Sequence, residues 1–207
     1  MSARMKVPPT KSALLGLRRQ LRFLQQGHSM LERKRELLNR LVRERLERYH
    51  ELHSQARAVL AQAYRWLAVA QMRMGSQVIR QAALGTGPAV RVEIFPRSSV
   101  GIEYPAARAE EIALQPVGLM GTDASFDQAR SGMARTAVLL VQLGEAETAL
   151  WRLLTEQRRT QRRVNALRYN IIPRYRATIR FIDSMLEEDE RTTLFQIKRL
   201  RQSGRGV

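Results

Sequence analysis

Among the residues of this chain that could bind a partner, the arginines are the most informative in number and spacing. Nine of them lie between Trp151 and Phe181, against a single acidic residue, Glu156. Guanidinium groups bind carboxylates and phosphates through paired hydrogen bonds. An acidic partner is therefore favoured over a merely solvated face, on which like charges would repel one another. The arginines cover all faces of a helix and no set of base-stacking aromatics accompanies them, which favours an acidic protein surface over nucleic acid. Seven form the candidate interface: Arg158, Arg159, Arg162, Arg163, Arg168, Arg174 and Arg176.

Two places offer side chains that could hold a metal ion. His50 and His53 lie one helical turn apart, but the string His-Glu-Leu-His lacks the spacing of the zinc-protease motif. The acidic run Glu187–Glu190 could hold a cation, or it could be a solvated face or a contact with a basic neighbour. The solvated reading is favoured in both cases, so we expect no metal site.

Catalytic constellations are missing from the sequence. Gly85–Pro88 lacks the lysine-containing pattern of a phosphate-binding loop and is interpreted as a helix stop, with nucleotide binding the minor alternative. The absence of cysteine excludes disulfides and thiolate chemistry. No nucleophile, base and orienting group occur together. We therefore expect no catalytic residues, no cofactor and no enzymatic activity of the chain's own.

A first long helix is predicted over residues 10–84. Thr10 follows two prolines and is a plausible N-cap. Apolar residues then recur at alternating steps of three and four, as in a heptad seam. After Val42 the phase slips by one residue, which is a stutter. The seam positions are Leu14, Leu17, Leu21, Leu24, Leu31, Leu38 and Val42, and then Leu46, Tyr49, Leu52, Ala56, Leu60, Ala63, Leu67, Ala70 and Met74.

Residues 85–121 are too rich in glycine and proline for a helix. Residues 90–94 alternate apolar and charged side chains, which predicts a half-buried strand, and residues 100–104 could be its partner. A short β-hairpin is predicted here, with Val90, Val92, Ile94 and Ile102 as its candidate apolar residues.

A second long helix is predicted over residues 122–200. Ser125 and Gln128 have the spacing of a capping box, and Pro173 should bend the helix locally. Its seam is clearest at Val164, Leu167, Ile171, Tyr175, Ile179, Ile182 and Leu186. Trp66 and Trp151 are interpreted as core residues of their helices.

The predicted fold class is all-α dominated: a long antiparallel two-helix coiled coil with a short β-hairpin at the turn. Each helix of about 75 residues would be on the order of 110 Å long, so the two seams must bury each other. The predicted organisation is an N-terminal tail (1–9), a long helix (10–84), a hairpin and loop region (85–121), a second long helix (122–200) and a C-terminal tail (201–207). The formal charge of +17 again demands acidic partners, and no signal peptide or membrane-spanning run is evident.

Two segments of the sequence resemble one known family. The first is Pro9–Leu15 with Leu17–Leu21, Gly27-His28 and Leu31–Leu37. The second is Arg162–Pro173, followed by Thr178–Ile182, Glu190-Arg191 and Phe195–Arg199. Together these segments resemble the D subunits of the V-type (archaeal and vacuolar) rotary ATPases. The string Arg-Arg-Val-Asn-Ala-Leu is quite specific, and the resemblance covers nearly the whole chain. Arg168 departs from it, since the family tends to have glutamate there.

The resemblance implies a non-catalytic central rotor shaft, or central stalk. Its helical ends would enter a hexamer of A and B subunits, which the seven arginines would contact, and its hairpin would lie near the F subunit. Its base would rest on the C (or d) subunit, so the chain would meet the membrane only through the complex, on the cytoplasmic side. It would couple ATP hydrolysis or synthesis to proton or sodium transport, without direct nucleic-acid contact.

The residues alone leave two alternatives. A basic coiled coil could bind nucleic acid, with an affinity that falls steeply with salt. It could also be a docking protein of an export assembly. Neither accounts for the two matching segments.

Overall fold

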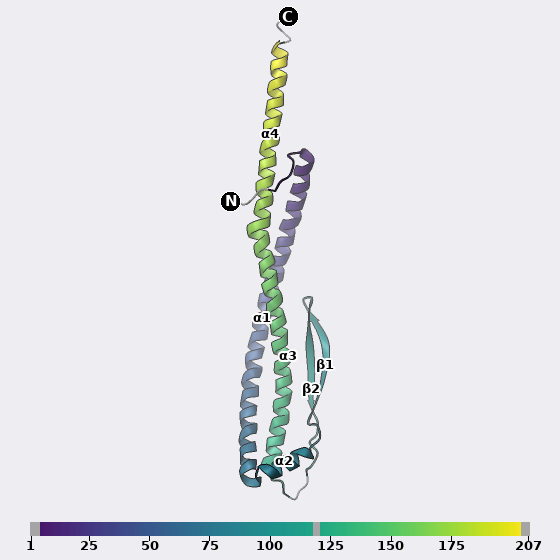
Figure 1. The fold of residues 1–207 in the computed structure, drawn as a ribbon, viewed down its shortest axis with the longest axis vertical. Helices are drawn as coiled ribbons and strands as arrows, with labels where there is room; N and C mark the ends of the chain where they lie inside the picture. The colour runs from purple at the N-terminus through teal and green to yellow at the C-terminus, as the bar shows by residue number, and fades with distance from the viewer. Residues whose placement is uncertain (1–4, 118–120, 204–207) are drawn as a thin grey trace. The chain divides into compact units, whose positions relative to one another are not determined.

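The computed structural model describes residues 5–117 and 121–203 (Figure 1). The outermost predicted tail residues (1–4 and 204–207) and Gly118 lie outside the described residues. The described residues form long helices and one two-stranded antiparallel sheet, which confirms the predicted fold class. In chain order the elements are α1 (Lys11–Met74), α2 (Ser76–Leu84), β1 (Val90–Ser99), β2 (Ile102–Glu111), α3 (Ala124–Ala166), the π-helix η1 (Leu167–Ile171) and α4 (Ile172–Ser203).

The chain divides into two compact units. Unit 1 holds residues up to 37 together with those from 157 onward, and unit 2 holds residues 38–156. Within the described ranges, none of the helices has a run of residues apolar enough to cross a membrane.

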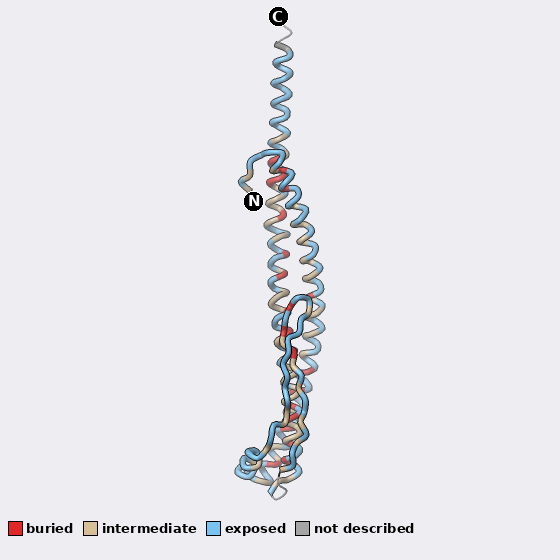
Figure 2. The backbone as a smooth tube through the Cα atoms, turned by 90° about the vertical axis from the view of Figure 1, so that its right-hand side faces the viewer, coloured by how far each residue is buried: buried red, intermediate tan, exposed pale blue. Residues whose placement is uncertain are grey.

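Unit 1 pairs the start of α1 with α4 around large aliphatic side chains. Its buried cluster is Leu14, Leu17, Ile179 and Ile182, with Met5, Val7, Leu21, Tyr175 and Leu186 packed against it. Every predicted seam residue from Val164 to Leu186 is buried or half-buried. Beyond residue 190 the described side chains of α4 are all exposed, as the pale blue end of the helix in Figure 2 shows.

Unit 2 pairs the rest of α1 with α3, and part of this contact is made by small side chains. Alanines at every seventh residue of α1, Ala56, Ala63 and Ala70, are buried. Opposite them, Gly132 of α3 comes so close that an added Cβ would lie 2.9 Å from the Cβ of Ala63. Leu46, a predicted seam residue at the stutter, is instead 41% exposed, and its neighbour Arg45 turns inward to the hairpin. At the stutter, the position expected to bury Leu46 is therefore replaced by one at which Arg45 faces the hairpin.

The hairpin of unit 2 is longer than predicted and turns at a different place. Strands β1 and β2 pair over ten residues each, from Val90 opposite Glu111 to Ser99 opposite Ile102. Val100 and Gly101 form the two-residue turn, both with positive φ (53° and 73°). Such a turn matches the twist of the strands, although a branched residue in it is unusual. Val100 and Gly101 therefore belong to the turn and not to the second strand.

Two interruptions divide the predicted long helices. Gly75 has φ +80° and ends α1, so the helix predicted to reach residue 84 is two helices. In the second helix, the five-residue π-helix η1 ends at Ile171, two residues before Pro173, and Ile172 donates its N–H to the carbonyl of Leu167. Proline has no N–H and its ring collides with the carbonyl four residues earlier, so the wider π-turn relieves the conflict predicted at this site.

The helix caps follow one prediction and correct another. Thr10 caps α1 by accepting the N–H of Ala13 at its Oγ1 (3.2 Å). Ser125 does not begin a capping box, since α3 starts at Ala124 and the Ser125 hydroxyl donates to the carboxylate of Asp123 (2.8 Å). Asp123 is therefore the residue that precedes the helix.

Candidate functional site

The seven candidate arginines lie on α3, η1 and α4, all within unit 1. Six of them are exposed, and Arg174 is half-buried. On α3, the side chains of Thr160 and Val164 are buried. The four arginines between residues 158 and 163 lie on the exposed surface of the helix. At η1, the Arg168 guanidinium lies 5.3 Å from the centroid of the exposed Tyr169 ring. The helix thus presents an arginine-rich surface suited to carboxylates.

Ion pairs join α1 to α4 elsewhere in unit 1. Arg18 donates two hydrogen bonds to the Asp183 carboxylate (2.9 and 2.8 Å). Lys11 lies 2.7 Å from Glu190, and the hydrogen bond to that carboxylate raises the pKa of the Lys11 ammonium above its usual value. In the Lys11–Glu190 pair, one residue of the acidic run Glu187–Glu190 therefore contacts a basic residue of the same chain.

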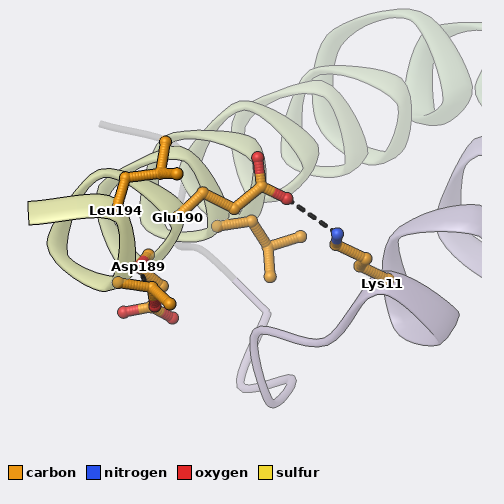
Figure 3. Close-up of a pocket in the computed structure, with 6 residues that line it drawn as sticks. Lys11, Asp189, Glu190 and Leu194 are labelled. Carbon is orange, nitrogen blue, oxygen red and sulfur yellow. Dashed lines mark hydrogen bonds and ion pairs between the residues drawn. The ribbon is translucent and has the colours of Figure 1, made fainter. Parts of the chain in front are cut away.

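A shallow groove opens beside the Lys11–Glu190 pair (Figure 3). Its volume is about 410 Å³, and it is lined by Lys11, Leu186, Asp189, Glu190, Thr193 and Leu194. Figure 3 shows the Lys11 ammonium pointing across the groove to Glu190. Within residues 5–117 and 121–203, no group of three or more His, Asp or Glu side chains is arranged to hold a metal ion.

The predicted histidine pair lies on an exposed face of α1. The ring of Tyr49 stacks on that of His53 (centroids 5.9 Å apart) and meets the ring of His50 edge-on (5.8 Å). Both histidines are exposed, as expected of a solvated helix face.

The predicted hairpin residues separate into two environments. Ile102 is buried and packs with Leu38 and Leu153, whereas Val92 and Ile94 are exposed (44% and 72%) and Val90 is half-buried. The prediction of a half-buried first strand was therefore wrong, because β2 packs on the helices and β1 lies outside it. The buried row is Ile102, Tyr104 and Ala106, which share one face of β2.

The structure also reveals surface residues that the sequence pattern did not identify. Trp151, expected in the core, is 68% exposed, and Trp66 is 38% exposed. A helical repeat does not separate a residue at the edge of a seam from one inside it. The exposed apolar residues at the end of α4 are a further set: Leu194, Phe195, Ile197 and Leu200.

Together these features define a coiled-coil protein with a β-hairpin and a basic, largely exposed helical surface. A family model that describes the D subunit of ATP synthase matches residues 13–202. The D subunit of the A-type ATP synthase of Pyrococcus furiosus is 33% identical, over 95% of this chain and 94% of that protein. The D subunit of the V-type ATP synthase of Thermotoga neapolitana is also 33% identical, over 96% of this chain and 98% of its own length. The chain belongs to the family of ATP synthase D subunits, whose members are central-stalk subunits of rotary ATPases.

Proposed function

We propose that this chain is the central rotor shaft of an A-type or V-type ATP synthase, without catalytic activity of its own. Its coiled coil would transmit rotation between ATP hydrolysis or synthesis in a hexamer of A and B subunits and proton or sodium transport in a membrane ring. The match to the D-subunit family over nearly the whole chain carries this proposal. The alternatives, a nucleic-acid-binding coiled coil and an export docking protein, do not account for that match.

The contacts inside the hexamer are assigned to the arginine-rich surface and to the end of α4. The exposed guanidinium groups from Arg158 to Arg176 suit acidic or polar side chains of a surrounding barrel. The exposed apolar residues near Phe195 would lose their contact with water inside such a barrel. An asymmetric shaft presents a different face to each of three similar sites, and the stutter and the π-turn both break the regularity of this one.

The remaining contacts lie outside the hexamer. The hairpin would regulate turnover or support the F subunit, and the base of the shaft would rest on the C (or d) subunit. The chain would then be peripheral to the membrane, on its cytoplasmic side, and attached only through other subunits.

Charge reversal in the assembled complex tests the arginine contacts. Arg158 and Arg162 lie one turn apart on α3, and the double variant R158E/R162E reverses both charges. We expect ATP-driven ion pumping to fall severalfold while ATP hydrolysis falls less, because a poorly held shaft slips. The matched control R57E/R65E reverses two exposed arginines of α1 in unit 2 and should retain coupling. Undiminished pumping and hydrolysis in R158E/R162E would refute the assignment of these arginines.

Affinity purification tests the function itself. The tagged chain is recovered from its native cells after nuclease treatment, and its partners are identified by mass spectrometry. We expect large nucleotide-binding subunits and ATPase activity in the eluate. An eluate of nucleic-acid-binding proteins that disappears with nuclease would instead establish the nucleic-acid alternative.

A further inference from the structure

Two charged side chains of α3 cover the outer edge of β2. The backbone N–H of Ala107 donates to the carboxylate of Glu145 (N to Oε2, 3.1 Å), and Arg152 donates from Nη1 to the carbonyl of Glu103 (2.6 Å). In an antiparallel ladder, the N–H and C=O of one residue point to the same edge, and alternate residues point to opposite edges. Glu103 and Ala107 therefore share the edge that faces away from β1. Pro105 lies between them and has no N–H that needs a partner.

The spacing of the two side chains fits the strand. Glu145 and Arg152 are two helical turns apart on α3, or about 10.5 Å. Glu103 and Ala107 are four residues apart on β2, or about 13 Å. The long guanidinium side chain can close the difference between the two spacings. One face of α3 thus supplies an acceptor and a donor to two of the backbone groups on the open strand edge.

Two further contacts hold the same stretch of β2. Ile102 packs between Leu38 and Leu153. The Tyr104 hydroxyl accepts a hydrogen bond from Arg45 (3.2 Å), whose guanidinium lies 5.7 Å from the centroid of the ring. In β1, by contrast, no residue is buried. The hairpin is therefore attached through residues 102–107.

We propose that Glu145 and Arg152 form a polar latch that holds the hairpin against α3, and that opening this latch lets the hairpin swing away as a folded unit. The two strands pair with each other over ten residues, and the latch uses none of these ladder bonds. Both latched backbone groups lie on an open strand edge, so water can replace the side chains when the latch opens. Glu145 and Arg152 are thus positioning residues, which act through β2.

Hydrogen exchange of the full chain tests the latch directly and does not depend on the proposed function. In E145A we expect the amide of Ala107 to exchange roughly ten times faster or more, since a hydrogen bond to a charged group is lost. The ladder amides of Tyr104 and Ala106, which point to β1, should keep their protection. The conservative variant E145Q retains an acceptor oxygen and should give an intermediate rate. The control E147A changes an exposed carboxylate of the same helix and should leave all these rates unchanged.

A distance measurement tests the swing. The chain has no cysteine, so spin labels can be placed only where cysteines are introduced. Labels at I94C on β1 and R135C on α3 occupy exposed positions within unit 2. We expect one narrow distance distribution with the latch intact and a broad one in E145A/R152A, while circular dichroism shows the helices intact. A narrow distribution in the double variant would overturn the proposal. Loss of the ladder protection in E145A would also overturn it, because the hairpin would then unfold instead of moving as a unit.

Discussion

Unit 1 packs its helices mainly through large aliphatic side chains, whereas one part of the contact between α1 and α3 in unit 2 consists of small ones. Unit 1 fills the space between α1 and α4 with Leu17, Ile179 and other large aliphatic residues. Unit 2 also buries large side chains such as Leu38 and Leu153, but between residues 56 and 70 its buried α1 residues are alanines seven residues apart, and Gly132 of α3 lies against one of them. Large side chains stabilise a helix pair through the apolar area that they bury, whereas small ones let the backbones approach closely but leave no room for added atoms. The aliphatic seam of unit 1 should therefore be sensitive to a loss of volume, and the contact between Ala63 and Gly132 in unit 2 to a gain.

The largest effect is expected where unit 1 loses volume. Ile182 is fully buried, so I182A removes apolar contacts and leaves a cavity. We expect the free energy of unfolding to fall by roughly 2–5 kcal/mol, measured by urea denaturation followed by circular dichroism. The control I197A removes a half-exposed side chain of the same helix and should change it by less than about 0.5 kcal/mol. Similar losses in both variants would show that the aliphatic seam does not stabilise unit 1.

A smaller loss is expected where unit 2 gains volume. Ala63 is 1% exposed and faces Gly132 at close range, so A63L forces α1 and α3 apart. Overpacking of this type costs roughly 1–3 kcal/mol of stability. A61L adds the same atoms to an exposed position two residues earlier and serves as its control. If A63L is as stable as A61L, the close approach in unit 2 does not limit side-chain size.

Two glycines of α3 should respond to alanine with opposite signs. In a helix, alanine is favoured over glycine by up to about 1 kcal/mol. A Cβ at Gly144 meets no atom within 4 Å, so G144A should stabilise the chain. At Gly132 the added Cβ collides with the backbone and side chain of Ala63, so G132A should destabilise it. Adding A63G to G132A removes that collision and should restore part of the loss in thermal denaturation. A gain in stability from G132A alone would contradict the tight contact.

The smallest expected effect is a loss of stability at the start of α3 when Asp123 is protonated at low pH. Hydrogen bonds from Arg73 and Ser125 hold the pKa of Asp123 below its ordinary value of 3.8. Because the folded pKa is lowered, the Asp123 carboxylate contributes its full stability above pH 3.8 and loses it as the pH falls through the lower folded value. We expect the protection of the first amides of α3, measured relative to their intrinsic exchange rates, to fall in that range. In D123N these amides should show no such dependence on pH, and an unchanged dependence would assign it to another group.

Periodicity predicted most of the fold because a buried seam imposes its spacing on the sequence. The seam from Val164 to Leu186, the Thr10 cap and the helix end at Gly85 follow from local chemistry that one segment contains. Gly75 was not predicted, since a lone glycine inside a helical pattern is often tolerated. Its positive φ shows why the helix ends there.

The hairpin and the surfaces depend on contacts that no local pattern contains. Alternation in β1 indicated a strand but not which strand would face the helices, because that choice depends on Leu38 and Leu153, far away in the sequence. Trp151 was assigned to the core by its position near the seam and is exposed. The candidate arginines were identified by composition, and their contacts with partner subunits remain a prediction.

One proline has a consequence for the chain before it meets any partner. Pro96 of β1 lies opposite Pro105 of β2. The backbone nitrogen of Pro96 therefore faces the outer edge of β1, away from β2. Its missing N–H interrupts the row of donors on the outer edge of β1, beside the exposed side chains of Ile94 and Phe95. An uninterrupted apolar edge would be a template on which newly made chains could stack strand upon strand. The proline should therefore keep free chains from aggregating while they wait to be assembled.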